Sequence, residues 1–259
     1  MKIAASSCCW WHDSLDNLLR KAAECGFTGV ELLTFPPELF NLHGNLREMK
    51  PADLARKLDA HGLRLAGLHL GCIRTHDEQL RRLMTDYAKL AVDFAVQLGC
   101  EIIVEGGPDR GVGPFEPFLE SVQELADACS GAAVKIALEN HYGNSIQFIE
   151  DYDRIFAAIT SPSVGMTLDT GHFTSSRVDP VEVARRFAHR VDHVHVKDHV
   201  RTQSVALGTG ETDNPGVARV LKAAGYRGYF SQELEVADRA NADRYACEGP
   251  EYMKKLIAV

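Results

Sequence analysis

Several features that mark other classes of protein are absent from this 259-residue sequence. No apolar run approaches the ~20 residues that cross a bilayer, so we expect no membrane span. Basic residues number 28 against 36 acidic ones, and the net charge of −8 argues against non-specific binding to nucleic acid or to an anionic membrane. The turn after the first strand-like segment lacks a GxGxxG pattern, which removes the main reason to expect a dinucleotide-binding fold.

Cysteines are few, scattered and odd in number. They form no CxxC pair, which argues against a thiolate zinc site. They also show no paired framework, so the sequence predicts reduced thiols of a cytoplasmic protein. The first residues lack an apolar segment long enough for a secretory signal, in keeping with that location. The cysteines are Cys8, Cys9, Cys25, Cys72, Cys100, Cys129 and Cys247.

What the sequence does contain is a regular alternation of apolar strand-like segments and helical segments with a 3.6-residue period. Dividing 259 residues by eight gives about 32, roughly one strand–helix unit. We therefore predict one domain over residues 1–259, an α/β fold that closes as a (β/α)₈ TIM barrel, with an open doubly wound sheet as the alternative. The predicted strands are 3–7, 29–33, 63–70, 101–107, 135–141, 164–170, 191–197 and 228–235.

Charged side chains gather at the predicted C-terminal ends of the strands, where barrel enzymes carry their functional groups. Strand alternation turns Glu139, Asp169, His195 and Glu233 toward the barrel interior, because apolar neighbours take the helix-facing positions. Burying such a cluster without a counter-charge would be costly. Three carboxylates and one imidazole suit one divalent cation: Mn²⁺ is our first choice, and Mg²⁺, Co²⁺, Fe²⁺ or Zn²⁺ would also fit. Alternation alone does not separate Glu233 from Glu235.

Further polar residues near the same strand ends are predicted to bind substrate, with ordinary structural hydrogen bonding as the alternative for each. Trp10, Trp11 and His12 follow the first strand, where they either line the pocket or pack in the core. The predicted substrate-binding residues are His69, Glu105, His172, Lys197 and Arg201.

In this order, the strand-end motifs resemble those of the xylose isomerase-like barrel superfamily, which includes ketose 3-epimerases, hydroxypyruvate isomerase, inosose isomerases and dehydratases, and endonuclease IV. Ala-Leu-Glu-Asn at 137–140 resembles the first metal glutamate of that superfamily. Leu-Asp-Thr-Gly-His at 168–172 resembles its metal aspartate and substrate-binding histidine. His-Val-His-Val-Lys-Asp at 193–198 resembles its metal histidine strand.

The resemblance continues toward the C-terminus. Gly-Tyr-Arg-Gly-Tyr at 225–229, followed by Glu233, resembles the passage to the final metal glutamate, and this spacing favours Glu233 over Glu235. Arg201 lies where epimerases of the superfamily carry an arginine that contacts substrate. The segment 207–211 is similar to the glycine-rich loop after the seventh strand.

Some positions depart from the patterns of individual relatives. Residues 199–203 lack the Asp-Arg-His triplet of endonuclease IV, and Glu105 stands where the nuclease has histidine. Both differences argue against a nuclease. Ser145 stands where ketose epimerases carry a second glutamate, so we expect a different substrate range. The glycines at 106–107 and 208–210 are weak candidates for phosphate binding and do not decide whether the substrate is phosphorylated.

The residues and the resemblance together predict a metal-dependent isomerase or epimerase of a sugar, sugar phosphate or cyclitol. It would transfer a proton next to a carbonyl through a metal-bound enediolate, with Glu139 and Glu233 as base and acid. A dehydratase (lyase) acting on a keto-sugar, inosose or keto acid is the alternative, because enolisation is its first step too. A non-catalytic or partner-dependent barrel subunit is a third reading. The expected partner is a small carbohydrate; many such barrels form homo-oligomers, but no sequence feature fixes the number of subunits.

Overall fold

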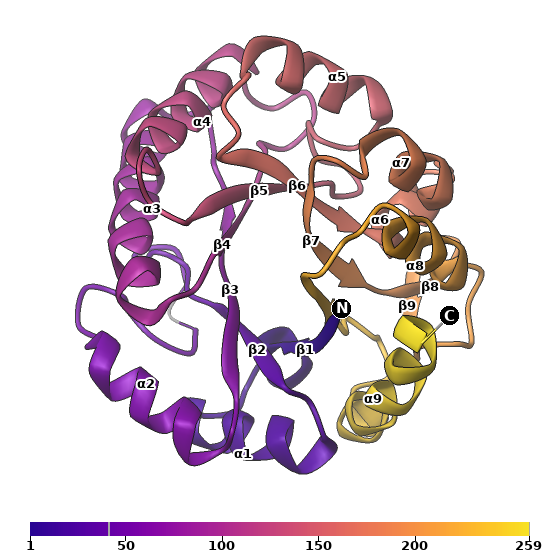
Figure 1. Ribbon diagram of the computed structural model, residues 1–259. Coiled ribbons are helices and arrows are strands. Elements are labelled where there is room, and N and C mark those ends of the chain that lie inside the picture. The colour runs from indigo at the N-terminus through magenta and orange to yellow at the C-terminus, as the bar shows by residue number, and fades with distance from the viewer. Residues whose placement is uncertain (41, 259) are drawn as a thin grey trace.

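Eight parallel strands close into a barrel in the computed structural model, which describes residues 1–40 and 42–258. Around the barrel the strands follow the order β1-β10-β7-β6-β5-β4-β3-β2, and helices surround them (Figure 1). The predicted (β/α)₈ barrel is thus confirmed. The barrel strands are β1 (Lys2–Ser6), β2 (Gly29–Leu33), β3 (Arg64–Cys72), β4 (Ile102–Gly106), β5 (Lys135–Glu139), β6 (Val164–Asp169), β7 (Val191–Val196) and β10 (Tyr229–Gln232).

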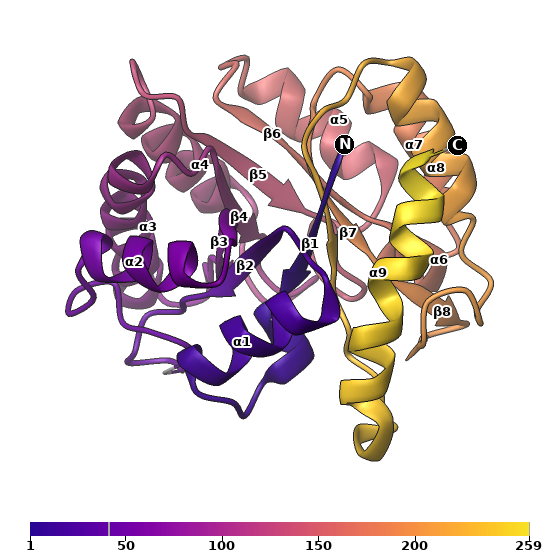
Figure 2. The same ribbon diagram turned by 60° about the horizontal axis from the view of Figure 1, so that its bottom comes forward.

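The helices lie outside the barrel, with α9 packed against α1 and α8 along one side (Figure 2). A short antiparallel hairpin, β8 (Asp198–Val200) with β9 (Gln203–Val205), follows β7 and was not predicted. The helices are η1 (Ser7–Trp10), α1 (Leu15–Cys25), α2 (Pro51–Ala60), α3 (Glu78–Leu98), α4 (Glu116–Ala128), α5 (Ile149–Ala158), α6 (Thr170–Ser175), α7 (Pro180–Phe187), α8 (Asn214–Ala223), η2 (Arg239–Asn241) and α9 (Ala242–Ala258).

Local sequence explains where several of these helices begin and end. Prolines occupy the first turn of α2, α4, α7 and α8, where a missing backbone N–H leaves no hydrogen bond unmade. The helices α1 and α3 end at Gly26 and Gly99, which adopt left-handed φ angles of 90° and 62°. Glycine adopts these angles without the steric cost that a Cβ brings.

The barrel wall separates the apolar layer under the helices from an interior that is polar at its C-terminal end. Along β5, Ile136 and Leu138 pack in the main core against the helices, while Ala137 faces inward and joins a small cluster with Ile102 and Val104. The same alternation leaves Glu139 facing inward at the end of the strand. Polar side chains therefore collect inside the barrel at its C-terminal end.

One prediction about the cysteines is wrong. Cys25, at the end of α1, and Cys247, on α9, form a disulfide across 222 residues of sequence. The reason lies in tertiary packing, because α1 and α9 are neighbours only once the barrel has closed. The other five cysteines are free, as predicted.

The disulfide predicts a simple thiol count. Denatured protein that has not been reduced should show five thiols with a chromogenic thiol reagent, and seven after reduction. The variant Cys247→Ser should show six in both states. A count of seven without reduction would contradict the Cys25–Cys247 bond.

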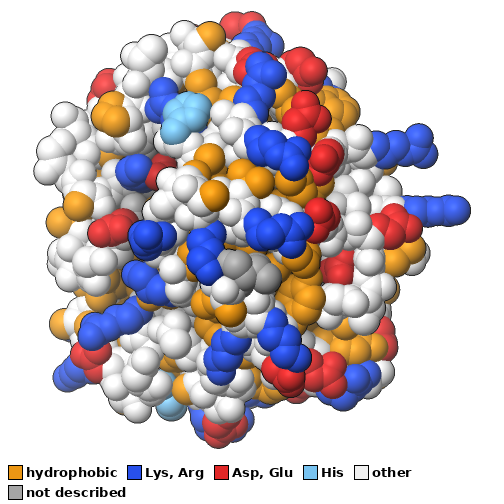
Figure 3. All heavy atoms as spheres, turned by 45° about the vertical axis from the view of Figure 1, so that its right-hand side comes forward, with side chains coloured by type: hydrophobic (Ala, Val, Ile, Leu, Met, Phe, Trp, Pro, Cys, Tyr) orange, Lys and Arg blue, Asp and Glu red, His pale blue; other side chains and the backbone are white. Residues whose placement is uncertain are grey.

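The outer surface mixes charges of both signs. On the face that includes the C-terminal part of the chain, Lys and Arg side chains are interspersed with Asp and Glu, and apolar side chains lie between them (Figure 3). Within the described part of the chain, every helix is too short or too polar to cross a membrane.

Candidate metal centre

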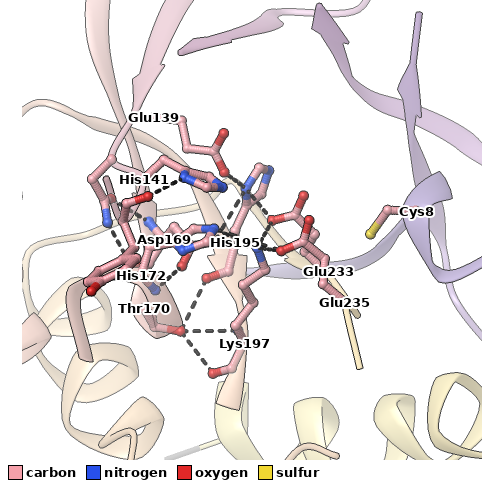
Figure 4. A network of polar contacts seen from close by, with 12 residues as sticks. Cys8, Glu139, His141, Asp169, Thr170, His172, His195, Lys197, Glu233 and Glu235 are labelled. Atoms are coloured by element: carbon pink, nitrogen blue, oxygen red, sulfur yellow. Dashed lines mark hydrogen bonds and ion pairs between the residues drawn. The ribbon is translucent and has the colours of Figure 1, made fainter. Parts of the chain in front are cut away.

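All four predicted metal ligands meet at the C-terminal end of the barrel (Figure 4). Glu139 and Asp169 end β5 and β6, His195 lies on β7, and Glu233 directly follows β10. The Nδ1 atom of His195 lies 2.6 Å from Glu139 Oε1, 3.1 Å from Glu233 Oε2 and 3.8 Å from Asp169 Oδ2. One ligand atom from each residue lies within 4.8 Å of those of the other three. Glu235, the alternative to Glu233, is not part of this group.

The chemistry of this group fits a divalent cation. All four side chains are buried, and one ammonium group, Lys197 Nζ, faces both Asp169 Oδ2 at 3.4 Å and Glu233 Oε2 at 2.8 Å. Buried acceptors are costly unless a donor or a positive charge faces them. Three carboxylates and one imidazole are a donor set that Mn²⁺, Fe²⁺, Co²⁺ and Zn²⁺ share, and the absence of thiolate separates it from a structural zinc site.

Mutual repulsion shows in the ionisation of the carboxylates. Burial raises the pKa of Asp169, and the charges of Glu233 and Glu139 raise it further, to about 8, against the opposing charge of Lys197. Burial also opposes ionisation of Glu139, but the charges of His195 and His69, together with the hydrogen bond to His195, hold the pKa of Glu139 below its usual range. The carboxylates of the cluster therefore repel one another, and a bound cation would relieve that repulsion.

Glu31 is a member of the site that our sequence analysis missed. It lies on β2, fully buried, and His195 Nε2 lies 3.0 and 3.1 Å from its two carboxylate oxygens. His193 Nε2 contacts the same carboxylate at 2.5 Å. A carboxylate on one ring nitrogen fixes the tautomer and orientation of a histidine whose other nitrogen binds a metal. The available signal was a single charged residue among the apolar residues of 29–33.

We expect Glu31→Gln to weaken metal binding without removing a ligand. An amide at this position lacks the negative charge that holds His195, and loss of such a partner typically costs 10–100-fold in metal affinity. Calorimetric titration of the metal-free protein with Mn²⁺ measures the change. Glu101→Gln, on the exposed residue just before β4 at the opposite end of the barrel, is the matched control. Unchanged affinity in Glu31→Gln would contradict the assigned role.

Three of the predicted substrate-binding residues border the cluster. His69 Nε2 lies 3.2 Å from Glu139 Oε2. Lys197 is fully buried, and its Nζ lies 2.8 Å from Glu233 Oε2 and 3.4 Å from Asp169 Oδ2. Lys197 Nζ also donates a hydrogen bond to His172 Nε2 at 2.9 Å. The structure thus brings His69, His172 and Lys197 to the predicted metal ligands.

A second group of titratable residues lies beside the first. His141, His172 and Glu235 could place ligand atoms within 4.8 Å of one another. Lys197 Nζ, however, lies 2.9 Å from His172 Nε2 and 2.7 Å from Glu235 Oε2. The ammonium group supplies the positive charge there, so we assign no metal to this second group.

Arg201 is not brought to the cluster. It occupies the exposed turn between β8 and β9, with a left-handed φ of 56°. Its backbone N–H faces Glu211 Oε2 at 3.3 Å, and its carbonyl accepts a hydrogen bond from Ser175. A role of its guanidinium in substrate binding therefore remains a prediction that rests on the family resemblance.

Glu105 is also outside the cluster, although it lies on the correct strand. Ile102 and Val104 face the barrel interior and Ile103 packs against the helices, so alternation places Glu105 on the helix side. Its carboxyl is completely buried, and its two oxygens have no hydrogen-bond partner among the described residues. Burial raises the pKa of Glu105 well above its usual value.

This buried carboxyl makes stability depend on pH. The pKa of Glu105 is higher in the folded chain than in the unfolded chain. The protein therefore has its full stability at pH values below the pKa of the unfolded chain. It loses stability as the pH rises toward the pKa of the folded chain. We expect Glu105→Met to raise the free energy of unfolding by about 2–4 kcal/mol at pH 8 and much less at pH 5. Urea unfolding of both proteins at the two pH values checks this. An equal effect at both would contradict it.

The glycine-rich loop after β9 is organised by a carboxylate of the chain itself. Asp198 Oδ2 accepts hydrogen bonds from the backbone N–H groups of Gly208 and Gly210, both at 2.9 Å. Its Oδ1 accepts one from Thr212 at 3.1 Å. These N–H groups are therefore engaged, and the loop does not present them to a phosphate.

The aromatic residues after β1 divide between the two alternatives that the sequence left open. Trp10 is buried in the core, edge-on to Phe27. Trp11 is partly exposed and packs against the ring of Phe40, with centroids 5.6 Å apart. His12 is exposed. Trp10 is thus a core residue, while Trp11 lies at the C-terminal end of the barrel.

The closed barrel and the buried carboxylate–imidazole cluster at its C-terminal end place this protein among the TIM barrels with a candidate metal centre. The sequence profile of the family described as "Xylose isomerase-like TIM barrel" matches residues 19–256. The chain belongs to that family, as its motifs predicted.

Individual relatives include a dehydratase and a catabolism protein. An inosose dehydratase of Geobacillus kaustophilus is 24% identical over 205 residues, which cover 72% of this chain and 63% of that enzyme. The rhizopine catabolism protein MocC of Rhizobium meliloti is 25% identical over an alignment that covers 100% of this chain and 89% of MocC. The match to the first relative thus spans less than two thirds of its length.

Solved structures share the fold over its full length. A D-tagatose 3-epimerase-like protein superposes with a TM-score of 0.82 at 21% identity, covering 100% of this chain and 97% of that one. The IolI protein, solved with a bound zinc atom, superposes with a TM-score of 0.77 at 19% identity, covering 100% and 98% of the two chains. At these identities the likeness establishes the fold.

Proposed function

We propose that this chain, as a single domain over residues 1–259, is a divalent-metal-dependent isomerase or epimerase of a carbohydrate. The observation that carries this proposal is the convergence of Glu139 and Glu233 on His195 Nδ1, at 2.6 and 3.1 Å, from strands separated by β6 and β7. Two carboxylates that reach one point from different strands can remove a proton on one side of a bound substrate and return it on another.

Glu139, Asp169, His195 and Glu233 would hold the cation. When bound, a divalent cation supplies the positive charge that stabilises oxygens becoming negative during enolisation. Mn²⁺ is the identity we propose, and the zinc atom bound to the IolI protein shows that a member of this fold accepts a divalent metal.

The surrounding residues have distinct tasks in this proposal. Either Glu139 or Glu233 removes the proton from the carbon next to the carbonyl, and the other carboxyl donates one back. His69 contacts Glu139 and positions it. His172 and Lys197 offer hydrogen bonds to substrate oxygens from the buried side. Arg201, on its exposed turn, would bind the outer part of the substrate.

A dehydratase is the second candidate, and Lys197 is the observation that favours it. Its buried ammonium lies 2.8 Å from Glu233 Oε2, one of the two carboxylates proposed to transfer the proton. After proton removal by a glutamate, a proton from this ammonium could pass to the departing hydroxyl, which would leave as water. The similarity to an inosose dehydratase supports the same reading.

The experiment that tests the proposal is a metal-supplemented screen in deuterated water, read by NMR. Ketoses, inososes and keto acids are each incubated with protein that has been loaded with Mn²⁺. Deuterium on the carbon next to a carbonyl, with an isomeric product, is the expected result. An unsaturated or deoxy-keto product would assign the lyase instead. Failure to bind any divalent metal after Mn²⁺ addition would overturn both.

A barrel that works only with a partner subunit gives its own result in this screen. The protein would bind metal and remain inactive alone, and activity would appear on adding the partner.

We also propose a cytoplasmic location; the Cys25–Cys247 disulfide is the observation against it, since such bonds are rare in that compartment.

A further inference from the structure

An apolar pocket opens at the C-terminal end of the barrel, on the side of β2 and β3. It has a volume of about 510 Å³ and is formed by the loops after β1, β2 and β3 together with the start of α3. This is the size of a small-molecule site. Its main apolar lining residues are Trp11, Phe35, Leu39, Phe40, Leu80 and Met84.

Side-chain contacts connect the wall of the pocket with the metal centre. The ring of Phe35 lies edge-on to His69, with centroids 6.0 Å apart, and His69 Nε2 lies 3.2 Å from Glu139 Oε2. Cys72, at the end of β3, also lines the pocket. Two side-chain contacts thus lead from the aromatic wall to a proposed catalytic carboxylate.

The backbone is built to seat this wall. Gly71 has a left-handed φ of 95°, and a Cβ there would lie 2.9 Å from the ring of Phe35. Trp11 and Phe35 rest on a small apolar cluster of Cys8, Leu33 and Leu42, which is separate from the main core. The rings of Trp11 and Phe35 are therefore held in place by buried apolar side chains.

The upper side of the pocket is open. Leu39 is 38% and Phe40 48% exposed, and the ring of Phe40 packs against Trp11. Burial of these side chains against a ligand would contribute favourable binding free energy, in proportion to the apolar area that is removed from water.

Two groups that a phosphate would use at this end of the barrel are already engaged. Arg74, on the pocket wall, is paired with Asp109 at 3.3 Å. The N–H groups of the glycine loop are engaged by Asp198. Neither a free cation nor a free set of amides is thus directed at a phosphate from these two places.

We propose that the substrate is a non-phosphorylated carbohydrate that carries an apolar or aromatic substituent, and that this substituent occupies the Trp11–Phe40 pocket. The assignment of the occupant as substrate rests on the proposed function. The polar ring of the substrate lies over the metal ligands, and its substituent extends past His69 and Phe35.

A matched pair of glycosides tests the pocket without turnover. Methyl and phenyl β-D-glucopyranoside differ only in the substituent, and neither carries a carbonyl that could react. We expect the Mn²⁺-loaded protein to bind the phenyl glycoside at least about tenfold more tightly, because burial of the phenyl ring adds apolar contact area. Affinities are measured by calorimetry.

Two variants locate the effect. Phe40→Ala should remove the preference for the phenyl glycoside, and Tyr142→Ala should keep it, because Tyr142 is equally exposed, at 48%, outside the pocket. Equal affinities in the unmodified protein, or a preference that survives in Phe40→Ala, would overturn the proposal. So would a dimer that Phe40→Ala dissociates, because a second copy would then cover the pocket.

The outcome stays separate from that of the proposed function. A phenyl preference without deuterium exchange in any ketose would support the pocket and count against the isomerase. Deuterium exchange without a phenyl preference would support the isomerase and overturn the pocket.

Discussion

Glu139→Gln and Glu233→Gln should each lower turnover by at least about a thousand-fold while the barrel remains folded. Each change removes a group proposed to carry a proton, which alone is worth about 10²–10⁴-fold. Each also replaces a negatively charged metal ligand with a neutral amide of the same shape. Glutamine keeps the shape of glutamate and leaves the apolar core unchanged, so we expect the barrel to stay folded, with some loss of stability because a charge that faces His195 is removed.

The measurements separate chemistry from folding. Activity is followed by deuterium uptake, metal content by elemental analysis, and folding by thermal melting. Glu101→Gln, at the other end of the barrel, should behave as the unmodified protein. Full activity in Glu139→Gln or Glu233→Gln would remove that residue from the mechanism, and an unfolded variant would show that the carboxylate is structural.

Lys197→Met should change metal affinity and turnover in opposite directions. The ammonium lies 2.8 Å from Glu233 Oε2 and 3.4 Å from Asp169 Oδ2, so it competes with a cation for the same oxygens. Removing a positive charge this close to a buried site relieves strong repulsion. We expect at least about tenfold tighter Mn²⁺ binding together with about a hundredfold lower turnover, because a donor to substrate oxygens is lost.

Calorimetric titration and initial rates measure the two effects on one preparation. The control is Lys135→Met. Lys135 lies at the start of β5 and pairs with Asp192 on β7. Weaker metal binding in Lys197→Met would contradict the competition and would show that Lys197 organises the ligands. A loss of elimination with retained isomerisation would favour the dehydratase reading.

Local periodicity in the sequence was sufficient to predict the barrel and three of the four converging side chains. Glu139, Asp169 and His195 follow apolar strand residues in an alternation that fixes their direction. Glu233 needed the family resemblance to separate it from Glu235, and the structure places only Glu233 in the cluster.

Other features depend on contacts that no local pattern describes. Glu31 lies within β2, and its partner His195 is 164 residues away. Glu105 was assigned to the substrate although Ile103, two residues earlier, faces the helices. The place of Arg201 depends on the β8–β9 hairpin, which interrupts the predicted passage from the seventh strand to a helix.

The bond between Cys25 and Cys247 turns most of the chain into a covalent ring. A protease that cuts any loop between these residues would open the ring without releasing a fragment. Nicked protein would then migrate as one molecule without reductant and as two pieces with it. The connection between β4 and α4, for example, would be cleaved while the rest of the barrel stays covalently joined.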